Sequence, residues 1–316
     1  MTDIGINYLT EENDKDVGKY DDIYKELIKR GYINTLKFPG KHCDINNFKR
    51  FISFIEKVNC KADLHGLPGM VPATHQKDFL KNVNWKQLEG DLKRTNKIER
   101  ISTHIGLDGK DKISNYKVSE LKKNFNSNII EMKYRMKEML NKDVSFGGEN
   151  QPGGFEIDKI TISPEFISEI WDKMDFGVFD ISHAKYSAKE MNISYMCFLK
   201  SLYNIEKVKI IHVSGDTDRS NKSNSKVDKH MLINDTEIKD IIDSIKFFPN
   251  LDLVISEYAY HSKYSYEKEI VIEALVLNNI VKYLDYEKAN KILIYLENNL
   301  KNNVSNLNEI LNYIEK

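Results

Sequence analysis

The sequence predicts a single α/β domain, a (β/α)8 or TIM barrel with extra C-terminal helices. Short apolar runs such as residues 208–211 and 253–256 recur along the chain, each followed by helical sequence, which is typical of buried parallel strands. A His, Asp or Glu closes most of these runs, and barrels of this class build their active sites at the carboxyl ends of their strands. A length of 316 residues is common for one such barrel.

Eight segments are predicted as strands because each is apolar, short and bounded by polar residues. In chain order they are residues 3–8, 34–38, 62–65, 101–104, 144–149, 177–180, 207–212 and 253–257.

Amphipathic segments between these strands are predicted as the covering helices. Gly31 ends the first helix, Asp44 caps the second, and Ser163 followed by Pro164 and Glu165 opens another. The predicted helices are residues 21–31, 45–58, 85–94, 118–140, 163–174, 188–203 and 236–245. Residues 1–285 are interpreted as the metal-binding barrel and residues 286–316 as a helical extension packed on its outside.

Composition narrows the class of protein. The apolar share of 41% suffices for a large core, and the net charge of −1 provides no overall basic field for nucleic acid. Three isolated cysteines, Cys43, Cys60 and Cys197, fit a reducing compartment. No signal peptide or run of 18 apolar residues is seen, so we expect a cytoplasmic protein without a membrane partner.

Nine residues of metal-ligand type follow the predicted strands closely, which predicts a multinuclear metalloenzyme rather than a metal store. Imidazoles with several carboxylates can hold more than one ion and suit zinc, iron or manganese. The nine are His65, His104, Glu149, Asp180, His183, His212, Asp228, His230 and Glu257.

The remaining histidines, His42, His75 and His261, are interpreted as surface residues or as neighbours of the ligands. Three further side chains, Phe38, Met70 and Tyr258, either line the mouth of the pocket or pack in the core.

Motifs at these ligands resemble the superfamily of endonuclease IV and xylose isomerase-like barrels. They are THIG at 103–106, ENQPG at 149–153, DISHA at 180–184 and SKVDKH at 225–230. The pair Asp228 and His230, taken with His65 and His183, is similar to the trinuclear site of endonuclease IV, a DNA-repair enzyme.

This resemblance implies up to three Zn²⁺ ions, with iron as the alternative. His65, His104 and Glu149 would hold the first ion, and Glu149 would bridge to a second held by Asp180, His212 and Glu257. His183, Asp228 and His230 would hold the third.

The function that the resemblance implies is phosphodiester hydrolysis by a metal-bound hydroxide, with damaged DNA as the partner. Glu149, Asp180 and Glu257 are then the catalytic residues. Arg219, Lys222 and Lys226, in the polar loop 214–229, are candidates for phosphate contact.

Two alternatives stay open, because the residues beside the ligands depart from endonuclease IV. The segments HG at 65–66, STH at 102–104 and HVSG at 212–215 resemble the multinuclear non-heme iron oxidases that modify a cysteine-containing precursor peptide. A sugar isomerase or epimerase would need one ion, held by Glu149, Asp180, His212 and Glu257, with two acids moving protons.

Overall fold

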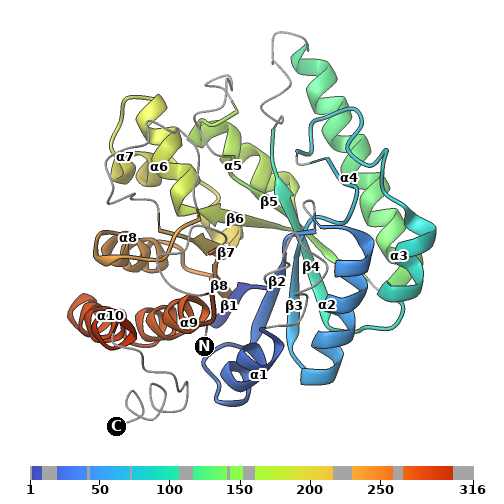
Figure 1. Cartoon of the computed structure of the whole chain (residues 1–316). Helices are drawn as coiled ribbons and strands as arrows, with labels where there is room; N and C mark the ends of the chain where they lie inside the picture. The colour runs from blue at the N-terminus through green and yellow to red at the C-terminus, as the bar shows by residue number, and fades with distance from the viewer. Residues whose placement is uncertain are drawn as a thin grey trace.

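In the computed structural model, eight parallel strands close into a barrel in chain order, and β8 pairs with β1 (Figure 1). The predicted fold class is therefore confirmed. The strands are β1 (Asp3–Asn7), β2 (Thr35–Phe38), β3 (Lys61–His65), β4 (Ile98–His104), β5 (Ser145–Glu149), β6 (Phe176–Asp180), β7 (Val208–Val213) and β8 (Leu253–Ser256). Among the strands, the bounds of β4 differ most from the prediction, because β4 begins at Ile98 rather than at residue 101.

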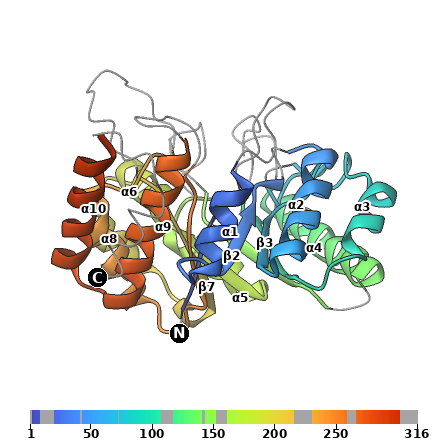
Figure 2. The ribbon, with the colours of Figure 1, turned by 60° about the horizontal axis from the view of Figure 1, so that its bottom comes forward.

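The structure describes residues 2–8, 20–40, 43–71, 73–106, 117–140, 143–151, 161–215, 230–258 and 266–301. Helices surround the barrel in these parts of the chain, as the view turned by 60° also shows (Figure 2). They are α1 (Asp21–Lys29), α2 (Ile45–Val58), α3 (Trp85–Leu92), α4 (Val118–Leu140), α5 (Pro164–Lys173), α6 (Ile181–Glu190), α7 (Tyr195–Ser201), α8 (Asp235–Phe247), α9 (Tyr266–Tyr283) and α10 (Tyr286–Lys301).

The connection between β6 and β7 differs from the prediction of one helix over residues 188–203. Helix α6 begins directly after β6, because the side chain of Asp180 caps it by accepting from the backbone N–H of His183. The helix ends where Asn192 takes a left-handed conformation, with φ of 63°. Ser194 then caps the separate helix α7.

The strand register brings the predicted ligands to one level of the barrel. His104 of β4 lies opposite Glu149 of β5, and Asp180 of β6 lies opposite His212 of β7. Because side chains alternate across a strand, residues two positions earlier face the same interior. These four residues therefore lie at the carboxyl ends of the strands, at the top of the barrel interior.

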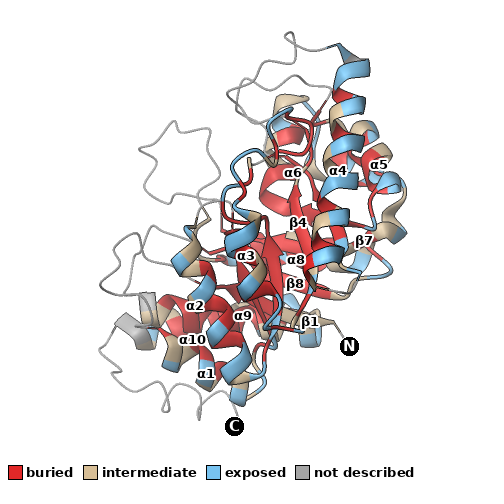
Figure 3. Ribbon diagram, turned by 90° about the vertical axis from the view of Figure 1, so that its right-hand side faces the viewer, coloured by how far each residue is buried: buried red, intermediate tan, exposed pale blue. Residues whose placement is uncertain are grey.

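The layers below the ligands are apolar on one side. Phe176, Val178, Ile210, Leu253 and Ile255 form a buried cluster of their own inside the barrel. A separate and larger core lies between the strands and the helices, and Figure 3 shows the strands and the inner faces of the helices as buried. Packed apolar side chains therefore lie directly below the site inside the barrel.

The last helices complete the described part of the chain. Helix α10 packs against α8 and α9 on the outside of the barrel, and Figure 1 shows α9 and α10 side by side. Residues 302–316 lie outside the described residues, so the division of the chain at residue 285 stays a prediction. None of the helices that the structure describes has the length and apolar character needed to cross a membrane.

Candidate metal centre

Two groups of ligand-type side chains meet at the carboxyl ends of the strands, and Glu149 belongs to both. One group is His65, His104 and Glu149, and the other is Glu149, Asp180, His212 and Glu257. Within each group, one candidate ligand atom per residue lies within 4.8 Å of all the others. Six of the nine predicted residues are therefore brought together in the way that metal binding requires.

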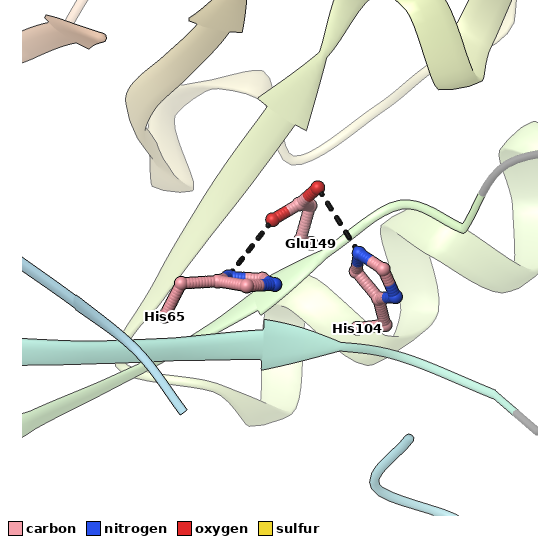
Figure 4. A group of neighbouring side chains, drawn as sticks. All are labelled: His65, His104 and Glu149. Carbon is pink, nitrogen blue, oxygen red and sulfur yellow. Dashed lines mark ion pairs between the residues drawn. The ribbon is translucent and has the colours of Figure 1, made fainter. Parts of the chain in front are cut away.

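Glu149 is the centre of the arrangement. Its Oε2 lies 3.2 Å from Nδ1 of His65 and 3.0 Å from Nδ1 of His212. Its Oε1 lies 3.4 Å from Nε2 of His104 and 3.2 Å from Nδ1 of His183. Figure 4 shows His65 and His104 approaching the two different oxygens of the carboxylate. A carboxylate placed in this way can bind a cation on each side.

The protonation states favour metal binding. Burial alone would raise the pKa of Glu149, but the imidazoles of His212, His65 and His104 hold it well below its usual value. Burial, together with the charge of Lys37, lowers the pKa of His212 to about 4. At neutral pH these two side chains are thus an anionic carboxylate and a neutral imidazole, which are the forms that bind metals.

Asn150 and Asp180 hold the ends of β5 and β6 in register. The Asn150 amide donates to the carbonyl of Asp180 at 3.0 Å and accepts from the backbone N–H of Asp180 at 2.7 Å. Nδ1 of His183 lies 2.8 Å from the carbonyl of Asn150, which fixes this ring beside Glu149. Asn150 of the ENQPG motif, with Asp180 and His183 of the DISHA motif, therefore forms one hydrogen-bonded unit beside Glu149.

His230 approaches the site from the segment after β7. Its Nδ1 lies 3.4 Å from Oε2 of Glu257, and its backbone is left-handed with φ of 44°, a conformation that is uncommon for a residue other than glycine. Gly215 and Met231 exchange two backbone hydrogen bonds of 2.7 and 2.8 Å, which secure the base of this loop.

Asp228 lies outside the described residues, as do the substrate-contact candidates Arg219, Lys222 and Lys226. Among the described residues, His183 and His230 fall in neither compact group. The third ion, held by His183, Asp228 and His230, therefore stays a prediction.

Two charged residues inside the barrel were not predicted as part of the site. Lys37 of β2 is 2% exposed; its ammonium forms an ion pair with Oε1 of Glu257 and lies 3.5 Å from Nδ1 of His212. Asp63 of β3 lies two positions before His65; burial raises its pKa to about 6 against the opposing charges of Lys37 and Arg100. The sequence did contain a signal for both residues. Side chains alternate between the two faces of a strand, and Lys37 and Asp63 lie on the faces of predicted strands 34–38 and 62–65 that point into the barrel.

Several other interpretations are settled by the packing. His75 is buried, not on the surface: it accepts from the backbone N–H of Gly106 at 3.0 Å and stacks on Phe125. Phe38 packs against aromatic side chains of α2, and the Tyr258 hydroxyl donates to Glu269. Met70 is buried, and its sulfur accepts from the backbone N–H of Leu67. His42 and His261 lie outside the described residues.

The buried ligand atoms of the site indicate that it can bind divalent ions. Both oxygens of Glu149 are buried and accept no hydrogen bond of regular geometry, and Nε2 of His212 also lacks one among the described residues. A buried anion without hydrogen bonds is costly unless a cation neutralises it. Imidazole nitrogen and carboxylate oxygen together suit zinc, iron or manganese.

Known structures share this fold at low sequence identity. They include a D-tagatose 3-epimerase-like protein, with 17% identity and a TM-score of 0.56 over 92% of this chain and 98% of the other. The 3-keto-D-glucoside 4-epimerase of E. coli has 12% identity and a TM-score of 0.55 over 90% and 99%. Endonuclease IV of Thermus thermophilus has 13% identity and a TM-score of 0.51 over 89% and 99%.

These likenesses show that the chain shares the barrel fold of these proteins. Epimerase and endonuclease structures match it to a similar degree, so the likeness does not separate the two activities. No protein-family model matches the sequence, and no curated protein matches it.

Proposed function

We propose that this chain is a multinuclear metal-dependent enzyme that hydrolyses phosphodiesters. The observation that carries the proposal is the position of Glu149, which belongs to both ligand groups: its Oε1 lies beside His104, and its Oε2 lies beside both His65 and His212. Two ions that share one carboxylate are typical of centres that cleave phosphate esters.

His65 and His104 would hold one ion together with Glu149, and Asp180, His212 and Glu257 would hold the other. When bound, such ions lower the pKa of coordinated water and stabilise charge on a phosphoryl group. The role of the protein is then to orient the ligands, which the Asn150 hydrogen bonds to Asp180 do at the ends of β5 and β6. We propose damaged DNA as the substrate and Arg219, Lys222 and Lys226 as its phosphate contacts.

The runner-up proposal is a sugar isomerase or epimerase. It is favoured by the group of Glu149, Asp180, His212 and Glu257, all of them buried. Such a group can hold one ion by itself and contains the carboxylates that proton transfer needs. It leaves His65 and His104 without a role, and their convergence on Glu149 is why we rank it second.

The iron oxidase proposal uses the same cage of ligands with iron in place of zinc, and a substrate thiolate from a cysteine-containing peptide as an additional ligand. Bound metal separates it from the hydrolase. Purification without oxygen followed by metal analysis should return at least two zinc ions per chain for the hydrolase, but iron with visible absorption for the oxidase.

A DNA duplex with one abasic site tests the reaction itself. The zinc-loaded protein should cut it beside the abasic site and leave a 3′-hydroxyl, and a chelator should abolish cutting. The Glu149→Gln variant should be inactive, while the exposed-surface variant Lys81→Gln serves as the matched control. One bound ion per chain, with epimerisation of a ketose and intact DNA, would support the runner-up instead.

A further inference from the structure

Among the ion pairs of the described residues, the ammonium group of Lys37 contacts the four-residue ligand group, at Glu257 and beside His212. It stands near the end of β2, with 2% of its surface exposed. Its Nζ reaches Oε1 of Glu257, and Nδ1 of His212 lies 3.0 Å from that same oxygen. Burying an ammonium group is costly unless it is paired. The ammonium group of Lys37 therefore lies beside a predicted metal ligand, at a position where a metal cation would otherwise bind.

Charge counting shows what Lys37 changes. Glu149, Asp180 and Glu257 bring three carboxylates, with three formal negative charges, to the four-residue group. The ammonium of Lys37 leaves two uncompensated charges, which is what a single divalent ion neutralises. Without the lysine, the same group would carry three negative charges and would attract a cation more strongly.

We propose that Lys37 sets the metal affinity of the centre by occupying one oxygen of Glu257 in place of a divalent ion. The inference rests on the proposed metal centre, but not on the reaction that the centre performs. A cation that binds Glu257 through Oε1 competes directly with the ammonium for that oxygen. The ammonium group of Lys37 would also repel a cation bound by the neighbouring His212.

The test is a metal titration of the full chain after removal of metal with EDTA. Zn²⁺ binding is measured against a competing chromophoric chelator, and bound zinc is counted by mass spectrometry. Lys37→Met removes the charge at similar volume, and Lys37→Arg keeps it. Lys61→Met is the matched control, because Lys61 is exposed at the opposite end of β3 and pairs with Asp3.

We expect Lys37→Met to bind its weakest zinc ion roughly tenfold or more tightly than the wild type, equivalent to about 1.4 kcal/mol. Lys37→Arg and Lys61→Met should bind as the wild type does. The metal-free Lys37→Met protein should also melt at a lower temperature and gain more from zinc. A purely structural role for the lysine predicts the reverse, namely weaker metal binding.

Unchanged or weaker zinc binding in Lys37→Met would overturn the inference, and so would tighter binding in Lys37→Arg. The arginine arm keeps the inference open to refutation even if the methionine variant does not fold. The proposed reaction fails separately: a wild type that binds zinc but leaves the abasic DNA intact rejects hydrolysis, whereas equal affinities in an active enzyme reject only the role of Lys37.

Discussion

Replacing Glu273 by glutamine should make the barrel less sensitive to pH. Glu273 lies on α9, where its Oε1 accepts from the backbone N–H of Ile233 at 2.6 Å and its Oε2 accepts from the Ser256 hydroxyl at 2.9 Å. The side chain thus ties the segment after His230 to the end of β8, next to Glu257. Glutamine can keep both contacts, because its oxygen can accept from Ile233 and its amide can donate to Ser256.

The magnitude follows from the pKa of Glu273. Burial raises it from 4.5 to about 8; the two hydrogen bonds oppose the shift, and the carboxylates of Glu269 and Glu237 add to it. Because the folded protein binds this proton more tightly than the unfolded chain does, its contribution to stability is complete below pH 4.5 and is lost as pH rises through about 8. The slope is about 1.4 kcal/mol per pH unit, so about 2 to 3 kcal/mol is lost between pH 5 and 7.

The assay is urea unfolding of metal-free wild type and Glu273→Gln at pH 5, 6 and 7, followed by circular dichroism. The free energy of unfolding of the variant should gain on that of the wild type as pH rises, since all other titrations cancel in the difference. Glu267→Gln, at a partly buried position on the same helix, is the control. A difference between wild type and Glu273→Gln that stays constant across this pH range would refute the assignment of a buried, proton-binding carboxyl group.

Three further predictions concern the centre and its support. Glu149→Gln should lose more bound zinc and activity than His65→Ala, because a neutral amide cannot bridge two cations; equal losses on metal analysis would contradict the bridge. Gly147→Ala should lower the free energy of unfolding in urea by about 1–3 kcal/mol, because the new Cβ would meet the Phe176 ring at 2.2 Å. Gly90→Ala on α3, where the space around the Cβ is open, should instead raise it by about 0.5–1 kcal/mol. EDTA should lower the melting temperature and zinc restore it, but zinc should have little effect on Glu149→Gln.

The positions of the strands and of most ligand candidates could be predicted from sequence because both depend on local patterns. An apolar run closed by a His or Glu marks a strand and its carboxyl end together, as at His104 and Glu149. Closure of the barrel then brings these ends to one level without further information. Whether the residues bind metal stays a prediction, but their convergence follows from the fold.

The errors arose where hydrophobic periodicity does not decide the structure. The residues after Asp180 lack an extended apolar stripe, yet α6 begins there because the Asp180 side chain caps it. For His75 the surface alternative is wrong, because its ring fills a buried position between Gly106 and Phe125. The contacts of His75 cannot be inferred from spacing, because they join segments that are distant in the sequence.

Lys37 shows why charge inside a barrel is informative even when it follows no family motif. The barrel interior is apolar below Asp180, His212 and Glu257, where Val178, Ile210 and Ile255 pack together. Compensating positive charge cannot come from that side, so it comes from Lys37 of β2.

Without metal, a centre with three carboxylates would be unstable above this apolar cluster, because buried anions need a positively charged partner. Lys37 supplies that partner for Glu257, and on our proposal divalent ions would supply it for Glu149. On our proposal, the ion pair of Lys37 with Glu257 stabilises the metal-free centre and also limits how strongly the centre would attract its last ion. Measuring the affinity for zinc, and not only the activity, therefore distinguishes the role of Lys37 from that of Glu149.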